Sequence, residues 1–337
     1  MKKYLFFVGI DVSKSKLDVT FLEKPLGKKI VHFVVSNDNK GIKEIVKQLN
    51  NRKIALEEVL ISFEDTGVYS LPLGCYLTRY KIDYWMIPAI EIKRSKGISR
   101  GKTDKNDSKD IAFYTLTHLH KLRLTQLPEL SLMELKLLFT EREKLLKSLR
   151  IIGSTSEGIG YIPKEAMGDV LKINKVVIKQ LQKAIEKVER KMKEIIQSNE
   201  QLKLQNELIQ SIPGVGPQTA LYIILVTKSF QSFENWRQVA CYAGVAPFQY
   251  SSGSSIKGRT KVNHLADKKL KSLLNMCALN SKKHDAELKQ YYARKVGEGK
   301  SKMLVLNNIR CKLLGRIFAT INRGTPYVNI QKFAAYF

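Results

Sequence analysis

Four carboxylates stand at positions where they could share a metal ion. Asp11 and Glu64 each end an apolar run of the kind that forms a buried strand. Asp104 and Asp107 are three residues apart, so on a helix they lie on the same side, about one turn apart. Clustered carboxylates repel one another unless cations lie between them, and hard oxygen ligands suit Mg²⁺ or Mn²⁺. Paired ions of this kind serve in-line displacement at phosphate, so the pattern predicts phosphoryl-transfer chemistry.

Two of these acids also have an ordinary structural explanation. Asp11 could cap a turn after its strand, and Asp104 could be an N-terminal helix acid that the helix dipole favours. Asp65 directly follows Glu64 and is its rival as a ligand. Asp110 continues the three-residue spacing, but we expect it on a solvated face. The four positions together, beside a basic segment, favour the metal site.

The elements that must position these acids follow the order of an RNase H-like α/β domain. The sequence predicts strands at 4–10, 17–22 and 30–35, a helix over 39–49 capped by Asn37 or Asp38, and a strand at 59–63. A helix over 71–79, a strand at 84–87, a basic loop over 91–102 and a helix over 103–118 follow. The cations of that loop are candidate nucleic-acid contacts: Lys93, Arg94, Lys96, Arg100 and Lys102.

The charge of the chain favours a polyanionic partner. Its 337 residues include 58 Lys and Arg against 31 Asp and Glu, a net charge of +27. Nucleic acid is favoured over an anionic membrane, since no basic amphipathic helix lies beside an anchor and no apolar stretch reaches about 18 residues. Four cysteines and five histidines are scattered without zinc-site or disulfide spacing. We therefore expect a reducing, cytoplasmic location and no membrane association.

The middle and last parts of the chain are predicted to be helical. Apolar residues at three- to four-residue spacing over 135–152 and 178–195 predict a coiled coil, either folded back within one chain or formed between subunits. Further on, SIPGVGPQTA has the pattern of a helix–hairpin–helix turn. There Gly214 and Gly216 would let backbone N–H groups approach a phosphate, unless the stretch is only a Pro/Gly break between helices.

A Ser/Gly cluster, QYSSGSSIKGRT, is the second candidate site. By itself such a cluster is typical of a flexible loop. Here it is followed by Lys257, Arg259 and Lys261, whose charges could stabilise a phosphorane-like transition state. A serine hydroxyl needs a base or a metal to become a nucleophile.

Five motifs, in the same order, resemble those of the DEDD transposases of insertion sequences, the family that includes the Piv-type DNA invertases: VGIDVSKSKLDV, FEDTGVY, KTDKNDSKDIA, SIPGVGPQTA and YAGVAPFQYSSGSSIKGRT. The resemblance covers nearly the whole chain. It implies a RuvC-like nuclease domain at 1–126, a coiled-coil connector at 127–207 and a C-terminal transposase domain at 208–337. The chain departs from the family's motifs at Asp65, where a small residue is commoner, and at Ser108, which replaces the usual alanine.

The resemblance also implies the roles of the site residues. The acidic tetrad would be Asp11, Glu64, Asp104 and Asp107. The catalytic serine precedes a glycine, which corresponds to Ser252, with Ser251 or Ser254 as the alternatives if the motif is shifted. The two halves of the site would then have to meet, within one chain or between subunits.

The implied activity is DNA recombination through a phosphoserine intermediate. Target and donor DNA would be chosen by a structured non-coding bridge RNA, and the protein would act as a homo-oligomer, a dimer or a tetramer on DNA, close to a prokaryotic nucleoid. Two alternatives remain. One is a RuvC-like nuclease that uses water while Ser252 is structural, and the other is a non-enzymatic basic protein whose acids are ordinary caps. A covalent protein–DNA adduct would distinguish the recombinase from both.

Overall fold

The structure is a computed structural model that describes residues 4–24, 31–95, 103–154, 161, 164–252, 256–262 and 266–329. The chain divides into two units, Met1–Leu127 and Pro128–Phe337. Each unit has its own apolar core and is described by itself. Among the described residues, no helix combines the length and the hydrophobicity that a membrane span requires.

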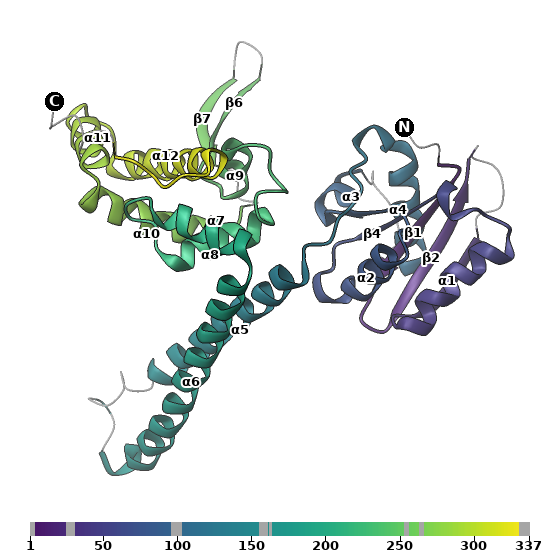
Figure 1. Cartoon of the computed structure of the whole chain (residues 1–337), viewed down its shortest axis with the longest axis horizontal. Coiled ribbons are helices and arrows are strands. Elements are labelled where there is room, and N and C mark those ends of the chain that lie inside the picture. Colours follow the sequence, from purple (N-terminus) through teal and green to yellow (C-terminus); the bar gives the residue numbers. More distant parts are fainter. Residues whose placement is uncertain are drawn as a thin grey trace. The chain divides into compact units, whose positions relative to one another are not determined.

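The first unit is built on a five-stranded mixed sheet, shown in purple and blue in Figure 1. Its order is β3-β2-β1-β4-β5. β2 runs antiparallel to β1 and β3, whereas β4 is parallel to β1 and β5. The carboxyl ends of β1 and β4 therefore meet at one edge. The strands are β1 (Phe6–Val12), β2 (Lys16–Glu23), β3 (Val31–Ser36), β4 (Val59–Glu64) and β5 (Tyr84–Ile87).

Helices cover both faces of this sheet. α1 (Asn39–Asn51) and α2 (Leu71–Arg79) share a core with Val8 and Ile10 of β1. α4 (Asp104–Thr117) packs on the other face, where Ala112 joins a core with Phe7. Short helices complete the unit: η1 (Leu56–Glu58), η2 (Gly67–Tyr69), α3 (Ala89–Ser95) and η3 (Leu119–Lys121).

Gly9 allows α4 to lie against the centre of the sheet. A Cβ atom at this position would be 2.2 Å from the carbonyl oxygen of Ser108 and 2.4 Å from the backbone nitrogen of Ala112. Those two atoms belong to helix backbone and have little freedom to move. The missing side chain thus sets how closely α4 approaches β1.

The basic segment before α4 differs from the predicted loop. Residues 89–95 form α3, because Ile92 is buried with Ile111 of α4 and the Glu91 carboxylate accepts a hydrogen bond of 2.6 Å from the Tyr114 hydroxyl. Residues 96–102 lie outside the described residues. At α1, the cap is Asp38, whose carboxylate accepts from the Gly41 backbone N–H at 2.8 Å.

The second unit begins with two long helices that pack against each other, α5 (Leu130–Gly153) and α6 (Lys164–Ser198), the teal pair in Figure 1. On α6, Ile185, Met192 and Ile195 of the predicted apolar seam are buried. Arg142 of α5 donates through Nε to Glu189 of α6 at 2.6 Å. The two helices therefore cover much of their apolar seam within one chain, the arrangement of a folded-back hairpin.

The rest of the second unit is mainly helical and shares one core with the adjoining ends of α5 and α6. It also contains a two-stranded antiparallel sheet where the sequence predicted only a Ser/Gly loop. The elements are α7 (Glu200–Gln210), α8 (Pro217–Thr227), α9 (Trp236–Tyr242), β6 (Pro247–Ser252), β7 (Ile256–Val262), α10 (Lys268–His284), α11 (Ala286–Gly297) and α12 (Lys302–Arg323).

Candidate active site

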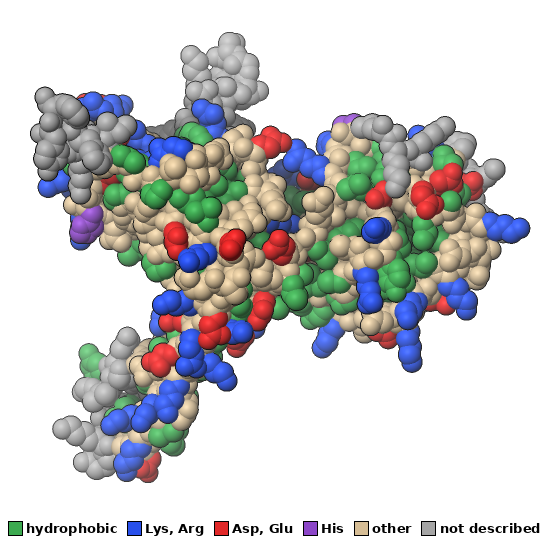
Figure 2. All heavy atoms as spheres, in the orientation of Figure 1, with side chains coloured by type: hydrophobic (Ala, Val, Ile, Leu, Met, Phe, Trp, Pro, Cys, Tyr) green, Lys and Arg blue, Asp and Glu red, His purple; other side chains and the backbone are tan. Residues whose placement is uncertain are grey.

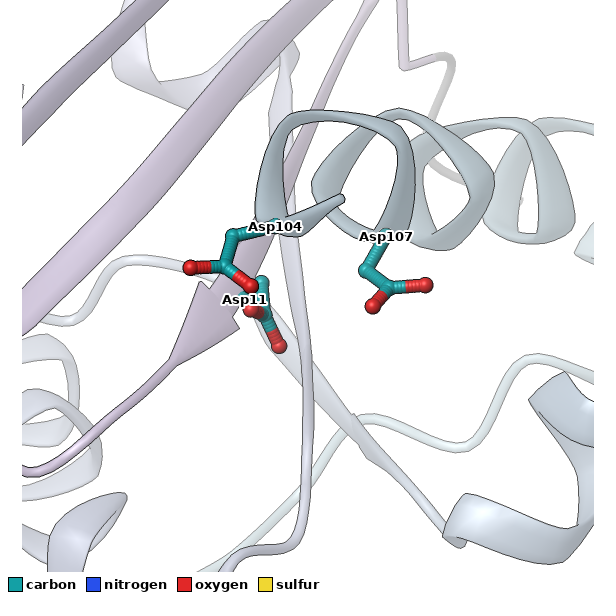
Figure 3. Close-up of side chains that lie close together, drawn as sticks. All are labelled: Asp11, Asp104 and Asp107. Carbon is teal, nitrogen blue, oxygen red and sulfur yellow. The ribbon is translucent and has the colours of Figure 1, made fainter. Parts of the chain in front are cut away.

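Three of the four predicted carboxylates meet at the carboxyl end of β1. Asp11, Asp104 and Asp107 each offer an oxygen atom, and these atoms all lie within 4.8 Å of one another (Figure 3). Asp11 comes from β1, and the two others from the first turn of α4. The Thr103 hydroxyl begins that turn by accepting from the Asn106 backbone N–H at 3.2 Å. The three-residue spacing then directs both helix acids to the same place.

Glu64 lies outside this trio but on the same face of the sheet. Phe63 of β4 pairs with Ile10 of β1 in parallel register, so Glu64 follows beside Asp11 at the next strand end. Its charge contributes to raising the pKa of Asp11. Asp65, the predicted rival, is exposed and accepts from the Gly67 backbone N–H at 3.0 Å, which is a turn interaction. Asp110 is half-buried rather than solvated and is not one of the trio.

The carboxylates of the site act on one another through their charges. Burial, and then the charges of Asp107, Asp104, Asp18 and Glu64, raise the pKa of Asp11 to about 6. This means that neighbouring carboxylates oppose the ionisation of a half-buried acid, and that a cation bound among them would favour it.

Three titratable residues of this neighbourhood were missed by the sequence prediction. Asp18 is buried and lies directly across the β1–β2 ladder from Asp11. Lys16 Nζ is 3.2 Å from Asp18 Oδ2 and 2.7 Å from Asp104 Oδ2. His32 Nε2 is 3.2 Å from Asp18 Oδ1. The detectable signal was an acid at an inward position of an otherwise apolar strand, which requires a charged partner.

The second predicted site is described only in part. Ser252 is at the end of β6, where it pairs with Ile256 of β7, and Ser251 pairs with Lys257. Ser254 lies outside the described residues. Arg259 and Lys261, like Lys257, are at alternate positions of β7. Their roles remain predictions.

The two motif glycines have different surroundings. Gly214 has a φ of +90°, and a Cβ there would be 2.2 Å from the Ser281 hydroxyl of α10. Gly216 is exposed, with open space where a Cβ would lie, and caps α8. The turn therefore requires glycine at 214 for its own packing, and phosphate contact at either glycine stays a prediction. Lys93 and Arg94 are exposed on α3, whereas Lys96, Arg100 and Lys102 lie outside the described residues.

Comparison with known proteins places the candidate residues within two transposase family models. A family model for DEDD transposases of the IS110 type, described as "Transposase", matches residues 8–151, which include all four acids. A second model, described as "Transposase IS116/IS110/IS902 family", matches residues 206–293, which include Ser252. The chain belongs to the IS110 family of DEDD transposases. It is thus a DNA recombinase, and the alternative of a non-enzymatic basic protein no longer stands.

Two relatives match nearly the whole length of the transposase. It is 24% identical to the pilin gene-inverting protein of Moraxella lacunata over 325 residues, 95% of this chain and 97% of that protein. The pilin gene-inverting protein of Moraxella bovis is 23% identical over the same shares. An insertion element IS110 uncharacterized 43.6 kDa protein of Streptomyces coelicolor is 30% identical over 120 residues, 36% of this chain and 29% of that protein.

Ser108, the departure from the family's usual alanine, is accommodated in the core beside the site. Its side chain is fully buried, and its Oγ donates to the Lys105 carbonyl at 3.0 Å. It is also 2.7 Å from the hydroxyl of Thr20, which is then the donor of that bond. Both buried hydroxyls are therefore paired, so the departure leaves the acid-bearing turn of α4 intact.

The residues of the site fit a divalent metal ion, which the family also implies. The donors are carboxylate oxygens, the ligands that hard cations prefer. The three carboxylates converge on one place, and their mutual repulsion contributes to raising the pKa of Asp11. Asp11, Asp104 and Asp107 would hold the ion, with Glu64 beside them.

We expect metal binding to release a proton below about pH 6. Since Asp11 must ionise to bind, the affinity for Mn²⁺ should fall about tenfold for each pH unit below the pKa of about 6 and change little above it. Calorimetric titration of the full chain between about pH 5 and about pH 8 measures this. An Asp11→Asn variant should bind weakly at every pH. An equal affinity for Mn²⁺ at both ends of the range in the unaltered protein would contradict the metal site.

Proposed function

We propose that this transposase is an RNA-guided DNA recombinase of an insertion sequence that acts through a phosphoserine intermediate. The observation that carries the proposal is the convergence of three carboxylates at the carboxyl end of β1 (Figure 3). The first unit is interpreted as an RNase H-like, RuvC-like domain, supported by its sheet order and by the crossing of α4 over β1. The proposed ligands of Mg²⁺, or Mn²⁺, are Asp11, Glu64, Asp104 and Asp107.

The carboxylates and the serine have distinct proposed roles. A divalent ion held by the carboxylates would supply Lewis-acid stabilisation of the charge on the scissile phosphate. Asp11, Asp104 and Asp107 would hold that ion, and Asp104 at present contacts Lys16. Lys257 and Arg259 neutralise the phosphate oxygens as Ser252 attacks.

The covalent step conserves the energy of the broken bond. The Ser252 Oγ loses its proton and forms an ester bond to phosphorus, while the bond from phosphorus to the leaving deoxyribose oxygen breaks and that oxygen takes up a proton. Because one phosphate ester replaces another, a second strand can attack the phosphoserine and be joined without an external energy source.

DNA is the proposed substrate, and a structured RNA is the proposed guide. Two full-length relatives carry the name pilin gene-inverting protein, which supports DNA strand exchange here. The net charge of +27 suits two polyanions at once. On the face drawn in Figure 2, Lys and Arg side chains are spread over both units. The family resemblance is the basis on which we propose guidance by a bridge RNA and a dimer or tetramer on DNA.

We expect recombination to require a specific RNA. Purified protein with target and donor DNA should give recombinant product only when the element's non-coding RNA is added. A scrambled RNA of equal length is the control, because it supplies the same charge without the pairing information. Sequencing of the junctions measures the result. Recombination at an equal rate without any RNA would contradict the guidance proposal.

Hydrolysis by a RuvC-like nuclease is the second candidate function. One observation favours it: the carboxylate trio is complete within Met1–Leu127, the unit that does not contain Ser252. Such a site could cleave DNA with water alone. The decisive experiment is to trap the reaction in denaturant and look for protein covalently joined to DNA, which hydrolysis does not produce.

A further inference from the structure

A groove runs between α1 and α2 on the face of the first unit that is opposite α4. Its volume is about 420 Å³, within the range of roughly 300–1,000 Å³ that holds small ligands. None of its lining residues belongs to the tetrad or to the predicted nucleic-acid contacts. The residues that matter are Asn39, Lys43, Cys75, Tyr76, Arg79 and Tyr80.

Aromatic rings and a guanidinium group lie together in this groove. The ring centroids of Tyr76 and Tyr80 are 4.4 Å apart. The Arg79 guanidinium is 6.0 Å from the centroid of the Tyr80 ring. Tyr80 is 52% exposed, so part of its side chain is accessible to a ligand. An exposed ring next to a guanidinium is the combination on which unpaired nucleobases stack.

The groove carries positive charge, which favours a polyanionic ligand. Lys43 and Arg79 line it, and no acid is among its described lining residues. The acids near the start of α1 are engaged: Asp38 accepts from the Gly41 backbone, and Glu44 accepts from Gln48 at 2.7 Å. A second copy of this chain, also at +27, is a poor electrostatic match for such a groove.

One end of the groove, at Asn39, lies at the edge of the sheet that carries the carboxylates. α1 follows β3 and α2 follows β4, and both strands run parallel to β1, so both helices begin where Asp11 ends its strand. Asn37 ties the two helix starts to this edge by donating to the carbonyls of Tyr69, at 3.0 Å, and Ser13, at 2.8 Å. This end of the groove and the carboxylates thus share one edge of the sheet.

We propose that this groove binds single-stranded nucleic acid, with a base stacked on Tyr80 and backbone phosphates paired with Lys43 and Arg79. The interaction requires neither the metal site nor Ser252. Its test is therefore carried out without metal and fails or succeeds independently of the proposed recombination.

Cys75 provides a local probe, because its exposed thiol lines the groove. The full-length protein is alkylated with a maleimide, with and without a saturating single strand of about 12 nucleotides, a length that typical single-strand sites cover. Mass spectrometry of the peptide that contains Cys75 gives the labelling rate. We expect the strand to slow this rate at least about fivefold, because a thiol covered by a bound strand reacts only when the strand dissociates. RNA and DNA strands are compared, and protection by RNA alone would assign the groove to RNA.

Matched variants connect protection to the named side chains. Tyr80→Leu and the double variant Lys43→Gln/Arg79→Gln should lose protection of Cys75. Tyr80→Phe keeps the ring and should retain it, as should Lys47→Gln, which removes the same charge from α1 outside the groove. Labelling rates without nucleic acid are measured for each variant as the baseline.

Three outcomes would overturn the proposal. The first is a Cys75 rate unchanged by a strand that fluorescence anisotropy shows to be bound. The second is equal protection by duplex DNA, which would mean phosphate contact without base stacking. The third is protection that rises with protein concentration in the absence of nucleic acid, which would mean that a second copy of the chain covers the groove.

Discussion

Asp11→Asn is expected to abolish strand cleavage while stabilising the metal-free fold. Removing a ligand from the carboxylate trio should lower the cleavage rate by at least about 10³-fold, since metal assistance contributes several kcal/mol to such transition states. The stability effect has the opposite sign. Folding raises the pKa of Asp11 from 3.8 to about 6, so its ionisation above pH 6 costs the folded state up to about 3 kcal/mol. Asparagine, which is uncharged, avoids that cost.

The pH dependence follows from the direction of this shift. A carboxyl group with a raised pKa favours the folded state below about pH 4, and that contribution is lost as the pH rises through about 6. Without metal, urea unfolding should therefore show Asp11→Asn to be more stable than the unaltered protein at about pH 8 and equal to it near pH 4. The effects on stability and on activity have opposite signs, because the negative charge of Asp11 destabilises the metal-free fold and also binds the metal.

Asp65→Asn is the matched control for this prediction. It removes one carboxylate charge at the end of the neighbouring strand, where Asp65 makes only a turn interaction with Gly67. Cleavage should be retained. Asp107→Asn should behave as Asp11→Asn does in the cleavage assay, because both belong to the trio. Cleavage by folded Asp11→Asn at the unaltered rate, with Mg²⁺ present, would remove the tetrad from the mechanism.

Most elements of the first unit were predictable because each carries a strong local signal. Alternating or continuous apolar runs gave β1 and β4, and the 103–118 prediction lies within a residue of α4. The segment after β5 was predicted less well, because the helix α3 depends on burial of Ile92 against α4, a contact that no local pattern contains. Packing between distant segments, such as Gly9 with Ser108, likewise appears only in three dimensions.

The site shows the same division between local and tertiary information. The spacing of Asp104 and Asp107 is a property of one helix, and it predicted that the two side chains converge, as they do; their roles stay predictions. Asp18 was not recognised, because its importance comes from the antiparallel register that places it across from Asp11. The β6–β7 pair was also missed, since a Ser/Gly-rich sequence has weak strand propensity and forms its ladder by pairing.

Ser252→Ala is expected to lose both DNA cleavage and the covalent adduct, while keeping nucleic-acid binding. Its hydroxyl is the proposed nucleophile, so alanine removes the group that would form the ester bond to phosphorus. The loss should be at least about 10³-fold, comparable to removing other essential nucleophiles. Slow nicking by water is compatible with the proposal, but an adduct is not. Ser251→Ala changes the neighbouring hydroxyl of the same strand and should retain activity.

The adduct decides between recombination and hydrolysis because it records which atom attacked phosphorus. The reaction is stopped in denaturant, the protein is digested, and the peptide joined to DNA is identified by mass spectrometry. A link at Ser252 supports the proposed nucleophile, whereas a link at Ser251 or Ser254 keeps the mechanism and corrects the position. Suppose instead that Ser252→Ala cleaves at the unaltered rate and that neither protein forms an adduct. The carboxylates at the end of β1 would then support hydrolysis of the phosphodiester by water, which is the reaction of a nuclease.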